Sequence, residues 1–423
     1  MPTTFPSLKS LSIRKIGHPV VLKDLITKWN VLNWSLQDWA VKFGDKPLPF
    51  RLGSINEGTA AGEPIWERNC PVEYMTLKEF IEWESSYEGQ MRSKWMYYDY
   101  KHMYEWFKDD EEFLKAIDWG CLGFYGRNGR DSTLWIGSHG AHTPCHADTY
   151  GFNLVAQLQG RKRWLLFPPD SPEILHHVTR VPYEESSIYV KGCVGGGKGG
   201  ARGIVLSPGE VLLVPRGWWH RVDTEGPISI SVNTWVSSEQ DDYARLEESL
   251  VRFIFATTVK SLPREWQKAL LNPNENDLPQ TSLAENLSLV KHTLKTCVSQ
   301  FLVGKVPHSE VMRTANISSE NFGQITSSPP TKRVKPLEES ETMQCVGEAS
   351  KPLLQIVPQV GSIGWFSWDN KESSPPQDDC ETLTRILDAF CHPDVISLVS
   401  QKMLSSSSGN YMPDRTSSGF HKP

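Results

Sequence analysis

Residues 143–169 read TPCHADTYGFNLVAQLQGRKRWLLFPP, and the interpretation of the whole chain starts from them. His146 and Asp148 lie two positions apart in a stretch where apolar and polar residues alternate. On a β-strand the side chains at positions i and i+2 project from the same face, so an imidazole and a carboxylate would lie side by side. A second segment, VPRGWWH, follows an apolar run and ends at His220.

Two histidines and one carboxylate, brought together by long-range strand pairing, form a facial triad. This ligand set leaves three positions open on an octahedral metal ion and is typical of non-haem Fe(II) oxygenases. A lone H-x-D pair is a weak signal, because two polar residues often share one strand face. The triad is therefore a hypothesis that requires His220 to lie beside the H-x-D strand.

The pattern between Ser132 and Val236 favours a β-rich fold. Apolar and polar residues alternate there in six segments separated by Gly/Pro turns: STLWIGS, FNLVAQLQG, KRWLLFPP, GIVLSPG, EVLLVP and PISISVNTWV. Short strands spaced in this way indicate a sandwich or barrel rather than βαβ units. Upstream, SLQDWAVKFG predicts a helix capped by Ser35, and TLKEFIEWESS predicts a helix with a capping box formed by Thr76 and Glu79.

Composition divides the chain into five regions. We expect N-terminal α/β elements over 1–130, a strand-rich core over 131–238 and a C-terminal helical unit over 239–303. Residues 304–352 are rich in Ser, Thr, Pro, Lys and Glu and predict a disordered linker. Residues 353–423 predict a short helical segment and a disordered tail. The glycine-rich insert 190–203 lacks a phosphate-loop pattern and is interpreted as a flexible loop at the rim of the barrel.

Charge and cysteine usage narrow the function classes. The 423 residues carry a net charge of −6, so there is no overall basic field to attract nucleic acid or acidic lipid. The eight cysteines contain no C-x-x-C pair, which argues against zinc modules and a disulfide framework. No apolar run approaches the ~20 residues that cross a bilayer, and we expect no secretory signal, because residues 1–15 lack an apolar stretch. The predicted location is cytoplasmic, with nuclear access left open; the basic run TKRVK (331–335) is interpreted as a solvated linker rather than a nuclear address.

Other residues near the triad suit a 2-oxoglutarate cosubstrate. Its keto acid end would occupy two open iron positions and leave the third for O₂. Its distal carboxylate needs a cation and a hydroxyl donor, which Lys162 and Thr143 can supply. Asn233 and Trp235 share one face of the last predicted strand. The predicted cofactors are therefore Fe(II), 2-oxoglutarate and O₂.

Three segments resemble the JmjC family of Fe(II)/2-oxoglutarate oxygenases: GSHGAHTPCHADTYGFNLVAQLQGRKRWLLFPP, LSPGEVLLVPRGWWH and ISISVNTW. The resemblance covers about residues 10 to 240. It implies a double-stranded β-helix core, that is a jelly-roll or cupin, with N-terminal α/β elements and C-terminal helices. The iron ligands of the family match His146, Asp148 and His220.

The cosubstrate pocket of the family can be carried over in the same way. Its residues for the distal carboxylate match Thr143 and Lys162, and its other pocket residues match Asn153, Asn233 and Trp235. A pocket tyrosine of relatives falls at Tyr97 or Tyr98, and the register leaves both open. The glycine-rich insert replaces an Asn-Pro-Asp segment that relatives carry, which affects the rim and not the ligands.

The resemblance implies an oxygenase that hydroxylates a side chain of an unidentified protein substrate. Since it is strongest to a branch of the family that associates with a small heat-shock protein, the alternative is a weakly catalytic or non-catalytic adaptor for such a protein. Lysine demethylation is less attractive because the chain lacks chromatin-reader and zinc modules, and tRNA-base hydroxylation is disfavoured by the acidic balance. The helices after residue 239 suggest a homodimer, as in a relative.

Several neighbours of the triad have simpler interpretations. His139 and His142 are expected to be structural or solvent-facing. Trp218 and Trp219 are expected to form barrel wall. Cys145 should face away from the metal, because neighbouring strand residues alternate.

Overall fold

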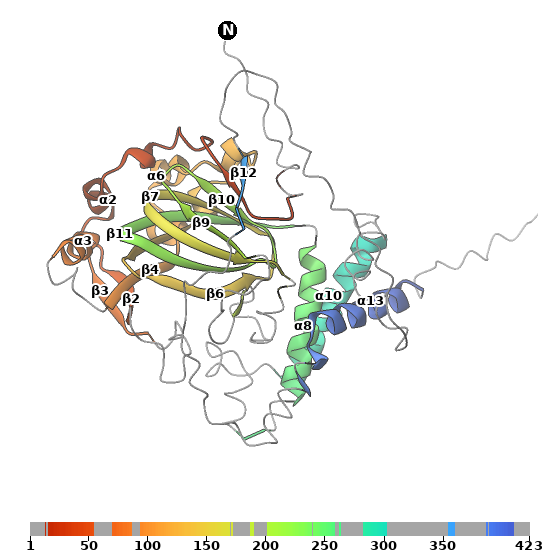
Figure 1. Cartoon of the computed structure of the whole chain (residues 1–423). Helices are drawn as coiled ribbons and strands as arrows, with labels where there is room; N and C mark the ends of the chain where they lie inside the picture. The colour runs from red at the N-terminus through yellow and green to blue at the C-terminus, as the bar shows by residue number, and fades with distance from the viewer. Residues whose placement is uncertain are drawn as a thin grey trace, which may run out of the picture.

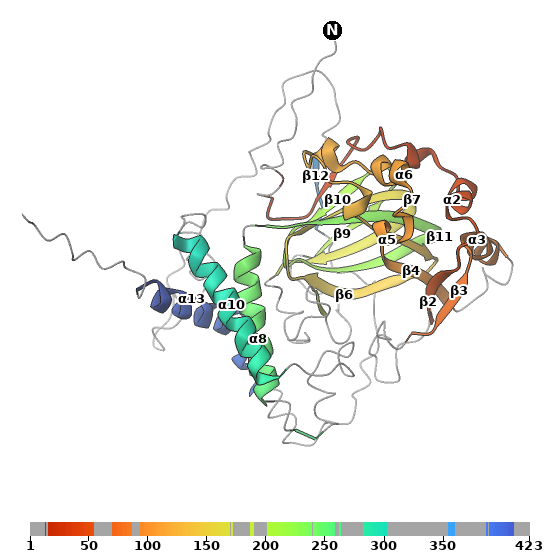
Figure 2. The same cartoon turned by 180° about the vertical axis from the view of Figure 1, so that it is seen from behind.

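A β-sheet that curls into a barrel organises the chain, with helices on two opposite sides of it (Figure 1 and Figure 2). The computed structural model describes residues 13, 16–54, 70–86, 94–169, 171, 187–189, 201–238, 240–258, 262–263, 282–302, 354–359, 386–387 and 389–409. The strands within these ranges are β1 (Val20–Leu22), β2 (Leu48–Ser54), β3 (Val72–Met75), β4 (Lys94–His102), β5 (Thr133–Ser138), β6 (His142–Asp148), β7 (Phe152–Phe167), β8 (Ser187–Tyr189), β9 (Arg202–Leu206), β10 (Val211–Val214), β11 (Trp219–Val236) and β12 (Leu354–Ile356). The helices are α2 (Leu36–Phe43), α3 (Leu77–Ser85), α5 (Met103–Phe107), α6 (Glu111–Ala116), α8 (Asp241–Thr258), α10 (Leu283–Leu302) and α13 (Pro393–Gly409).

The long strands β7 and β11 belong to both layers of the barrel. The first half of β11 lies between β6 and β7, and its second half lies between β5 and β7. Both strands bend where glycine takes a positive φ, at Gly160 (62°) and Gly226 (86°). A Cβ on Gly160 would lie 2.0 Å from the carbonyl oxygen of Ile228, so no other residue fits this bend. Segments FNLVAQLQG and KRWLLFPP, predicted as two strands, therefore form one bent strand.

The two layers enclose a first hydrophobic cluster inside the barrel. Val155 and Leu212 of one layer pack there with Trp164, Leu166 and Val222 of the other. The predicted class, mainly β with a jelly-roll core, is confirmed by this architecture and its family match.

A second, larger cluster lies outside the barrel, between the sheet and the N-terminal helices. It is rich in aromatic residues, and Phe50 and Phe80 stack at a centroid separation of 4.4 Å. Helices α2 and α3 begin at the predicted caps, because Ser35 and Thr76 each form a complete capping box. These helices cover the apolar face of the sheet.

Helices α8, α10 and α13 pack together on the other side of the barrel (Figure 1). Helix α8 packs in this unit through Leu246, Leu250 and Phe255. Helix α10 packs through Val290 and Cys297, whereas Leu283 and Leu287 near its start are 52% and 40% exposed.

Strand β12 is an element that the sequence pattern did not predict. It pairs with β1 at the edge of the sheet, and Val357 next to it is fully buried in the barrel cluster. Strand β12 therefore extends the barrel sheet, although it lies between α10 and α13 in the chain. The predicted linker 304–352 and almost all of the insert 190–203 lie outside the described residues.

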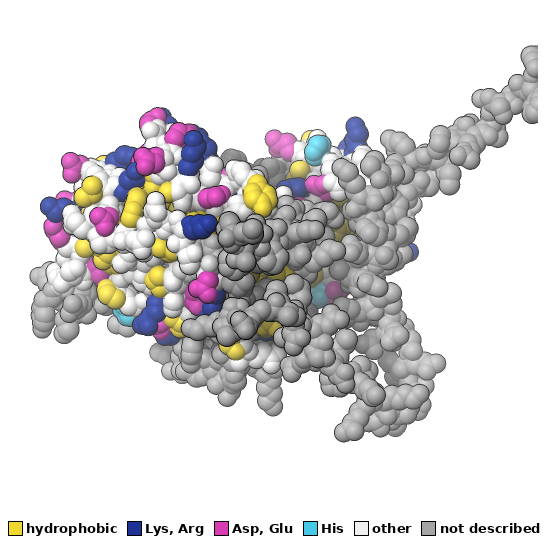
Figure 3. Space-filling model, turned by 90° about the horizontal axis from the view of Figure 1, so that it is seen from above, with side chains coloured by type: hydrophobic (Ala, Val, Ile, Leu, Met, Phe, Trp, Pro, Cys, Tyr) yellow, Lys and Arg dark blue, Asp and Glu magenta, His cyan; other side chains and the backbone are white. Residues whose placement is uncertain are grey.

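The helices and the charged side chains of the described surface can be compared with what a bilayer requires. None of the helices in the described ranges combines the length and the hydropathy that crossing a bilayer requires. On the face seen in Figure 3, acidic and basic side chains are interspersed over the barrel.

Candidate metal centre

The three predicted metal ligands meet inside the barrel on strands β6 and β11. His220 lies directly opposite His146 in the antiparallel pair, and Asp148 follows two positions later on β6. One potential ligand atom of each residue lies within 4.8 Å of the others, and His146 Nε2 is 3.9 Å from Asp148 Oδ1. All three side chains are buried. Among the described residues this is the one group of three such side chains that could hold a metal ion.

Backbone carbonyls orient both imidazoles. His146 Nδ1 donates to the carbonyl oxygen of Pro144 at 2.8 Å, and His220 Nδ1 donates to that of Trp218 at 2.9 Å. Since Nδ1 carries the proton, Nε2 presents its lone pair toward the partner ligands. Burial and the nearby His220 lower the pKa of His146 to about 4. The ring is thus neutral at pH 7, which is the form that binds a metal.

A chain of hydrogen bonds holds the Asp148 carboxylate. Its Oδ2 accepts from Trp235 Nε1 at 3.0 Å and from Asn153 Nδ2 at 3.3 Å. Asn233 Nδ2 donates to Asn153 Oδ1 at 2.8 Å, and Asn233 Oδ1 accepts from Trp135 Nε1 at 2.8 Å. Of the three residues predicted to line a cosubstrate pocket, Trp235 and Asn153 contact the carboxylate, and Asn233 supports Asn153. Their contact with a cosubstrate stays a prediction.

Lys162 lies on β7 and is 3% exposed inside the barrel. Its Nζ donates to the hydroxyl of Tyr97 at 3.0 Å. Burial lowers the pKa of Lys162 to about 7, and Asp99 opposes this shift. A buried ammonium with a phenol as its hydrogen-bond partner can bind a carboxylate, which would supply the opposite charge.

Two threonines accompany Lys162. Thr143 is 4% exposed and lies on β6, opposite Val222 of β11. Strand β11 separates β6 from β7, which carries Lys162. Thr224 lies opposite Lys162, and its Oγ1 is buried without a hydrogen-bond partner. An unpaired hydroxyl in a protein interior costs free energy, so it marks a place where a polar group fits. These residues therefore suit the distal carboxylate of 2-oxoglutarate.

The choice between Tyr97 and Tyr98 is resolved by the register of β4 against β5. Tyr97 points to Lys162, whereas Tyr98 is packed in the outer cluster, where burial raises its pKa. Tyr97 was one of the two candidates from the sequence, whereas Trp135 belongs to the site although the sequence did not single it out. The alternation of β4 contained a signal, because Tyr97 shares its face with the polar Asp99.

Several neighbouring residues of the triad are buried or partly buried, and the direction of Cys145 away from the metal stays a prediction. Burial raises the pKa of the Cys145 thiol to about 12, so no thiolate is present at pH 7. His142 packs on Trp95 at a centroid separation of 5.1 Å. Trp218 is part of the barrel cluster, and Trp219 is buried beside it.

Comparisons with known proteins agree with this architecture. Residues 9–242 match the family model of the cupin-like domain. The chain is 31% identical to the HSPB1-associated protein 1 homolog of Danio rerio over 93% of this chain and 95% of that protein. It is 36% identical to the HSPB1-associated protein 1 of Homo sapiens over 71% of this chain, a match that spans 64% of the human protein. It is 28% identical to the 2-oxoglutarate and iron-dependent oxygenase JMJD4 of Danio rerio, over 48% of this chain and 49% of that protein.

Proposed function

Because this chain belongs to the cupin-like (JmjC) domain family, we propose that it is an Fe(II)- and 2-oxoglutarate-dependent oxygenase that hydroxylates a protein side chain. The family contains proteins named as 2-oxoglutarate and iron-dependent oxygenases and as demethylases. The observation that supports catalysis most is the buried cluster of His146, Asp148 and His220 with its oriented imidazoles. A cluster of this composition suits ferrous iron.

The site contains two groups of residues, one for the metal ion and one for the cosubstrate. His146, Asp148 and His220 would hold Fe(II), and Lys162 with Thr143 would hold the distal carboxylate of 2-oxoglutarate. When bound, iron and 2-oxoglutarate supply the activation of O₂ by oxidative decarboxylation of the keto acid. The protein orients both groups and excludes water from their surroundings.

Three side chains keep these groups in position. Trp235 and Asn153 donate hydrogen bonds to Asp148 Oδ2, which leaves Oδ1 turned toward His146. Tyr97 accepts a hydrogen bond from Lys162 and aims the ammonium into the barrel. A bound carboxylate stabilises the charged form of Lys162, so the ammonium is retained at pH 7 when the cosubstrate is present.

The test is cosubstrate turnover by the full chain. Purified protein with Fe(II), ascorbate and 2-oxoglutarate is expected to release succinate without a protein substrate, and Asp148→Ala is expected to reduce this release to background. Asp223→Ala is the matched control, because Asp223 lies on β11 and pairs with Arg221 at 3.0 Å, away from the triad. Equal succinate release by wild type and Asp148→Ala would exclude the proposed activity.

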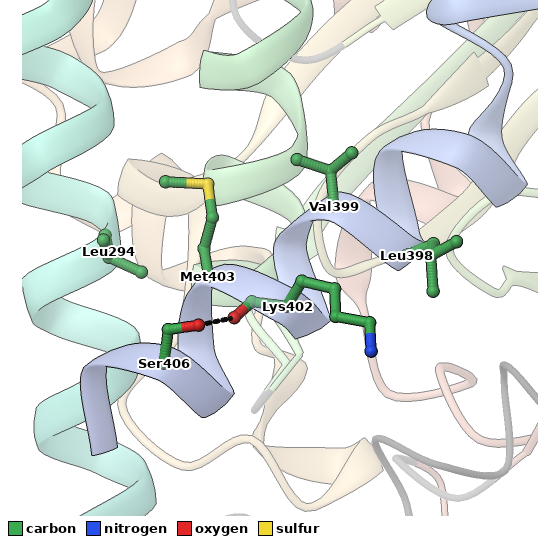
Figure 4. Close-up of a pocket in the computed structure, with 6 residues that line it drawn as sticks. All are labelled: Leu294, Leu398, Val399, Lys402, Met403 and Ser406. Carbon is green, nitrogen blue, oxygen red and sulfur yellow. Dashed lines mark hydrogen bonds between the residues drawn. The ribbon is translucent and has the colours of Figure 1, made fainter. Parts of the chain in front are cut away.

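A second candidate function is an adaptor for a small heat-shock protein in the cytoplasm. It is favoured by the names of two relatives, HSPB1-associated protein 1 and its homolog, and by the helical unit. Helices α10 and α13 border a groove of about 520 Å³ (Figure 4). It is lined by Leu294, Leu398, Val399, Lys402, Met403 and Ser406. Leu398 is 54% exposed, so this face can bind an apolar segment or a second copy of the chain.

Binding to a purified small heat-shock protein separates the two functions. An adaptor role predicts that Leu398→Asp weakens binding while Asp148→Ala binds as wild type does. Sedimentation of the chain alone tests the homodimer, which Leu398→Asp should then dissociate. If Leu398→Asp changes neither the binding nor the sedimentation, this face is not the interface.

A further inference from the structure

Helix α8 contacts the segment that follows the metal carboxylate. Residues 149–151 come directly after Asp148 at the end of β6. The amide of Gly151 donates to Asp241 Oδ1 at 2.7 Å, and Asp241 is 3% exposed at the start of α8. The guanidinium of Arg245 lies over the ring of Tyr150 at 4.8 Å. The helix therefore contacts two consecutive residues of this short segment.

Arg216 joins the same helix to both ligand-bearing segments. It lies in the turn that leads to His220, and its Nε donates to the carbonyl oxygen of Thr149 at 2.8 Å. Its Nη2 lies 3.7 Å from Glu247 Oε2 on α8. In the same turn, the amide of Gly217 donates to the carbonyl oxygen of Asp148 at 3.2 Å. One guanidinium thus bridges the chain after Asp148, the chain before His220 and the helix.

Ser238 also holds the carboxylate of Asp241. The two oxygens of Asp241 accept from the amide of Ser238 at 3.0 Å and from the hydroxyl of Ser238 at 2.6 Å. Gly151 has a φ of 60°, and a Cβ there would lie 2.3 Å from the carbonyl oxygen of Val236. Backbone on both sides of this contact is therefore held in a single arrangement.

From these contacts we infer that Arg216 and Asp241 are positioning residues for the metal site, so that helix α8 sets the separation of Asp148 and His220. The inference rests on the proposed metal centre. Neither residue touches the metal ligands' own side chains in the contacts described. They act through the backbone on either side. Groups that hydrogen-bond the ligand side chains directly change metal affinity about 10- to 100-fold, and these contacts through the backbone should have effects at the lower end of that range.

The experiment is an anaerobic titration of the full chain with Co(II), followed by the visible absorption of bound cobalt. Arg216→Met and Asp241→Ala are each expected to raise the Kd for Co(II) about tenfold and to alter the absorption band. Arg216→Lys should recover part of the affinity, because an ammonium can still donate to Thr149. Thermal unfolding without metal confirms that each variant is folded at the titration temperature.

Two variants of α8 serve as matched controls. Arg252 pairs with Glu248 at 2.7 Å within the helix, and neither residue takes part in the contacts with residues 149–151 described above. Arg252→Met and Glu248→Gln should perturb the helix and leave the Kd for Co(II) within about twofold of wild type. Unchanged cobalt binding in Arg216→Met, or an equal loss in the controls, would overturn the inference. Absence of cobalt binding in wild type would instead reject the metal centre itself.

Hydrogen exchange of wild type provides a measurement that needs no variant. Adding Co(II) should slow amide exchange at 149–151 and in the first turn of α8 together. If cobalt protects the barrel segment and leaves the helix unchanged, α8 does not act on the site.

Discussion

The two faces of strands β7 and β11 meet two different interiors. On one face Leu154, Ile230 and Val232 pack with the N-terminal helices in an apolar, aromatic-rich core. On the other face Asn153 and Lys162 project into the barrel, beside the metal triad. Burial of the apolar face stabilises the fold, whereas burial of amides and an ammonium costs free energy. The same strands therefore carry stability on one face and the proposed chemistry on the other.

The barrel face of these strands carries buried polar atoms that have no hydrogen-bond partner in the part of the chain that the structure describes. Within the described residues, Thr224 Oγ1, Ser231 Oγ and Gln157 Oε1 are buried in the barrel strands without a hydrogen-bond partner. The side chains that these two strands contribute to the outer core are apolar and have no polar atoms to pair. The barrel interior therefore presents unpaired polar groups that a polar ligand can bind, and their burial lowers the free energy of unfolding of the ligand-free protein.

The largest expected effect lies on the apolar face. Ile230→Ala should lower the free energy of unfolding by about 4 kcal/mol, because Ile230 is fully buried and its truncation leaves a cavity. Ser231→Ala, the next residue on the opposite face, should change it by less than about 1 kcal/mol. Urea denaturation of both variants measures the difference. Similar losses would contradict the division of stability between the faces.

Lys162→Met should stabilise the ligand-free fold and at the same time abolish 2-oxoglutarate binding. With a pKa near 7 in the fold and a usual value of 10.5, protonation of Lys162 favours the unfolded chain. Replacing it should raise the unfolding free energy of the ligand-free protein by about 4 kcal/mol at pH 7. The same variant should lose 2-oxoglutarate binding, measured by calorimetry. A destabilised variant would show that Lys162 supports the fold.

The pH dependence of that gain follows from the same pKa. The cost of burying Lys162 is full below pH 7, decreases as pH rises from 7 to 10.5, and vanishes above 10.5, where the unfolded chain is neutral too. The stability difference between Lys162→Met and wild type should shrink over this window. Since 2-oxoglutarate binding needs the ammonium, its Kd should rise up to about tenfold per pH unit above 7. A difference independent of pH would contradict the lowered pKa.

The smallest effect concerns Thr224. Thr224→Val removes a buried, unpaired hydroxyl and keeps the shape of the side chain, so it should raise the unfolding free energy by about 1 kcal/mol. Thr234→Val, on the same strand, is the comparison, because Thr234 Oγ1 donates to the carbonyl oxygen of Asp131 at 2.8 Å and its loss should destabilise. Thermal unfolding distinguishes the two signs.

The sequence predicted the features that depend on short spacings. The cap at Ser35 and the capping box at Thr76 depend on residues within three positions, and the H-x-D pair depends on two. His220 could be predicted as a metal ligand because the apolar segments EVLLVP and PISISVNTWV lie on either side of it in the sequence. The assignment of metal and cosubstrate roles to these residues stays a prediction that the experiments above test.

The features that escaped prediction depend on distant pairing. Placing Trp135 against Asn233 requires the register of β5 and β11. Strand β12 has three residues and no pattern of its own, so only its partner β1 defines it. The contacts of α8 with the segment after Asp148 join elements about ninety positions apart, and no local periodicity reports them.

The bend at Gly160 has a consequence for the order of residues along β7. Before it, odd-numbered side chains such as Asn153 and Val155 enter the barrel, and after it even-numbered ones such as Lys162 and Trp164 do so. A single left-handed residue thus inverts the parity of the strand, as Gly226 does for β11, where His220 gives way to Asn233. Inserting or deleting one residue between either glycine and the site would turn a functional side chain outward, so length changes in these strands can be accommodated only in pairs.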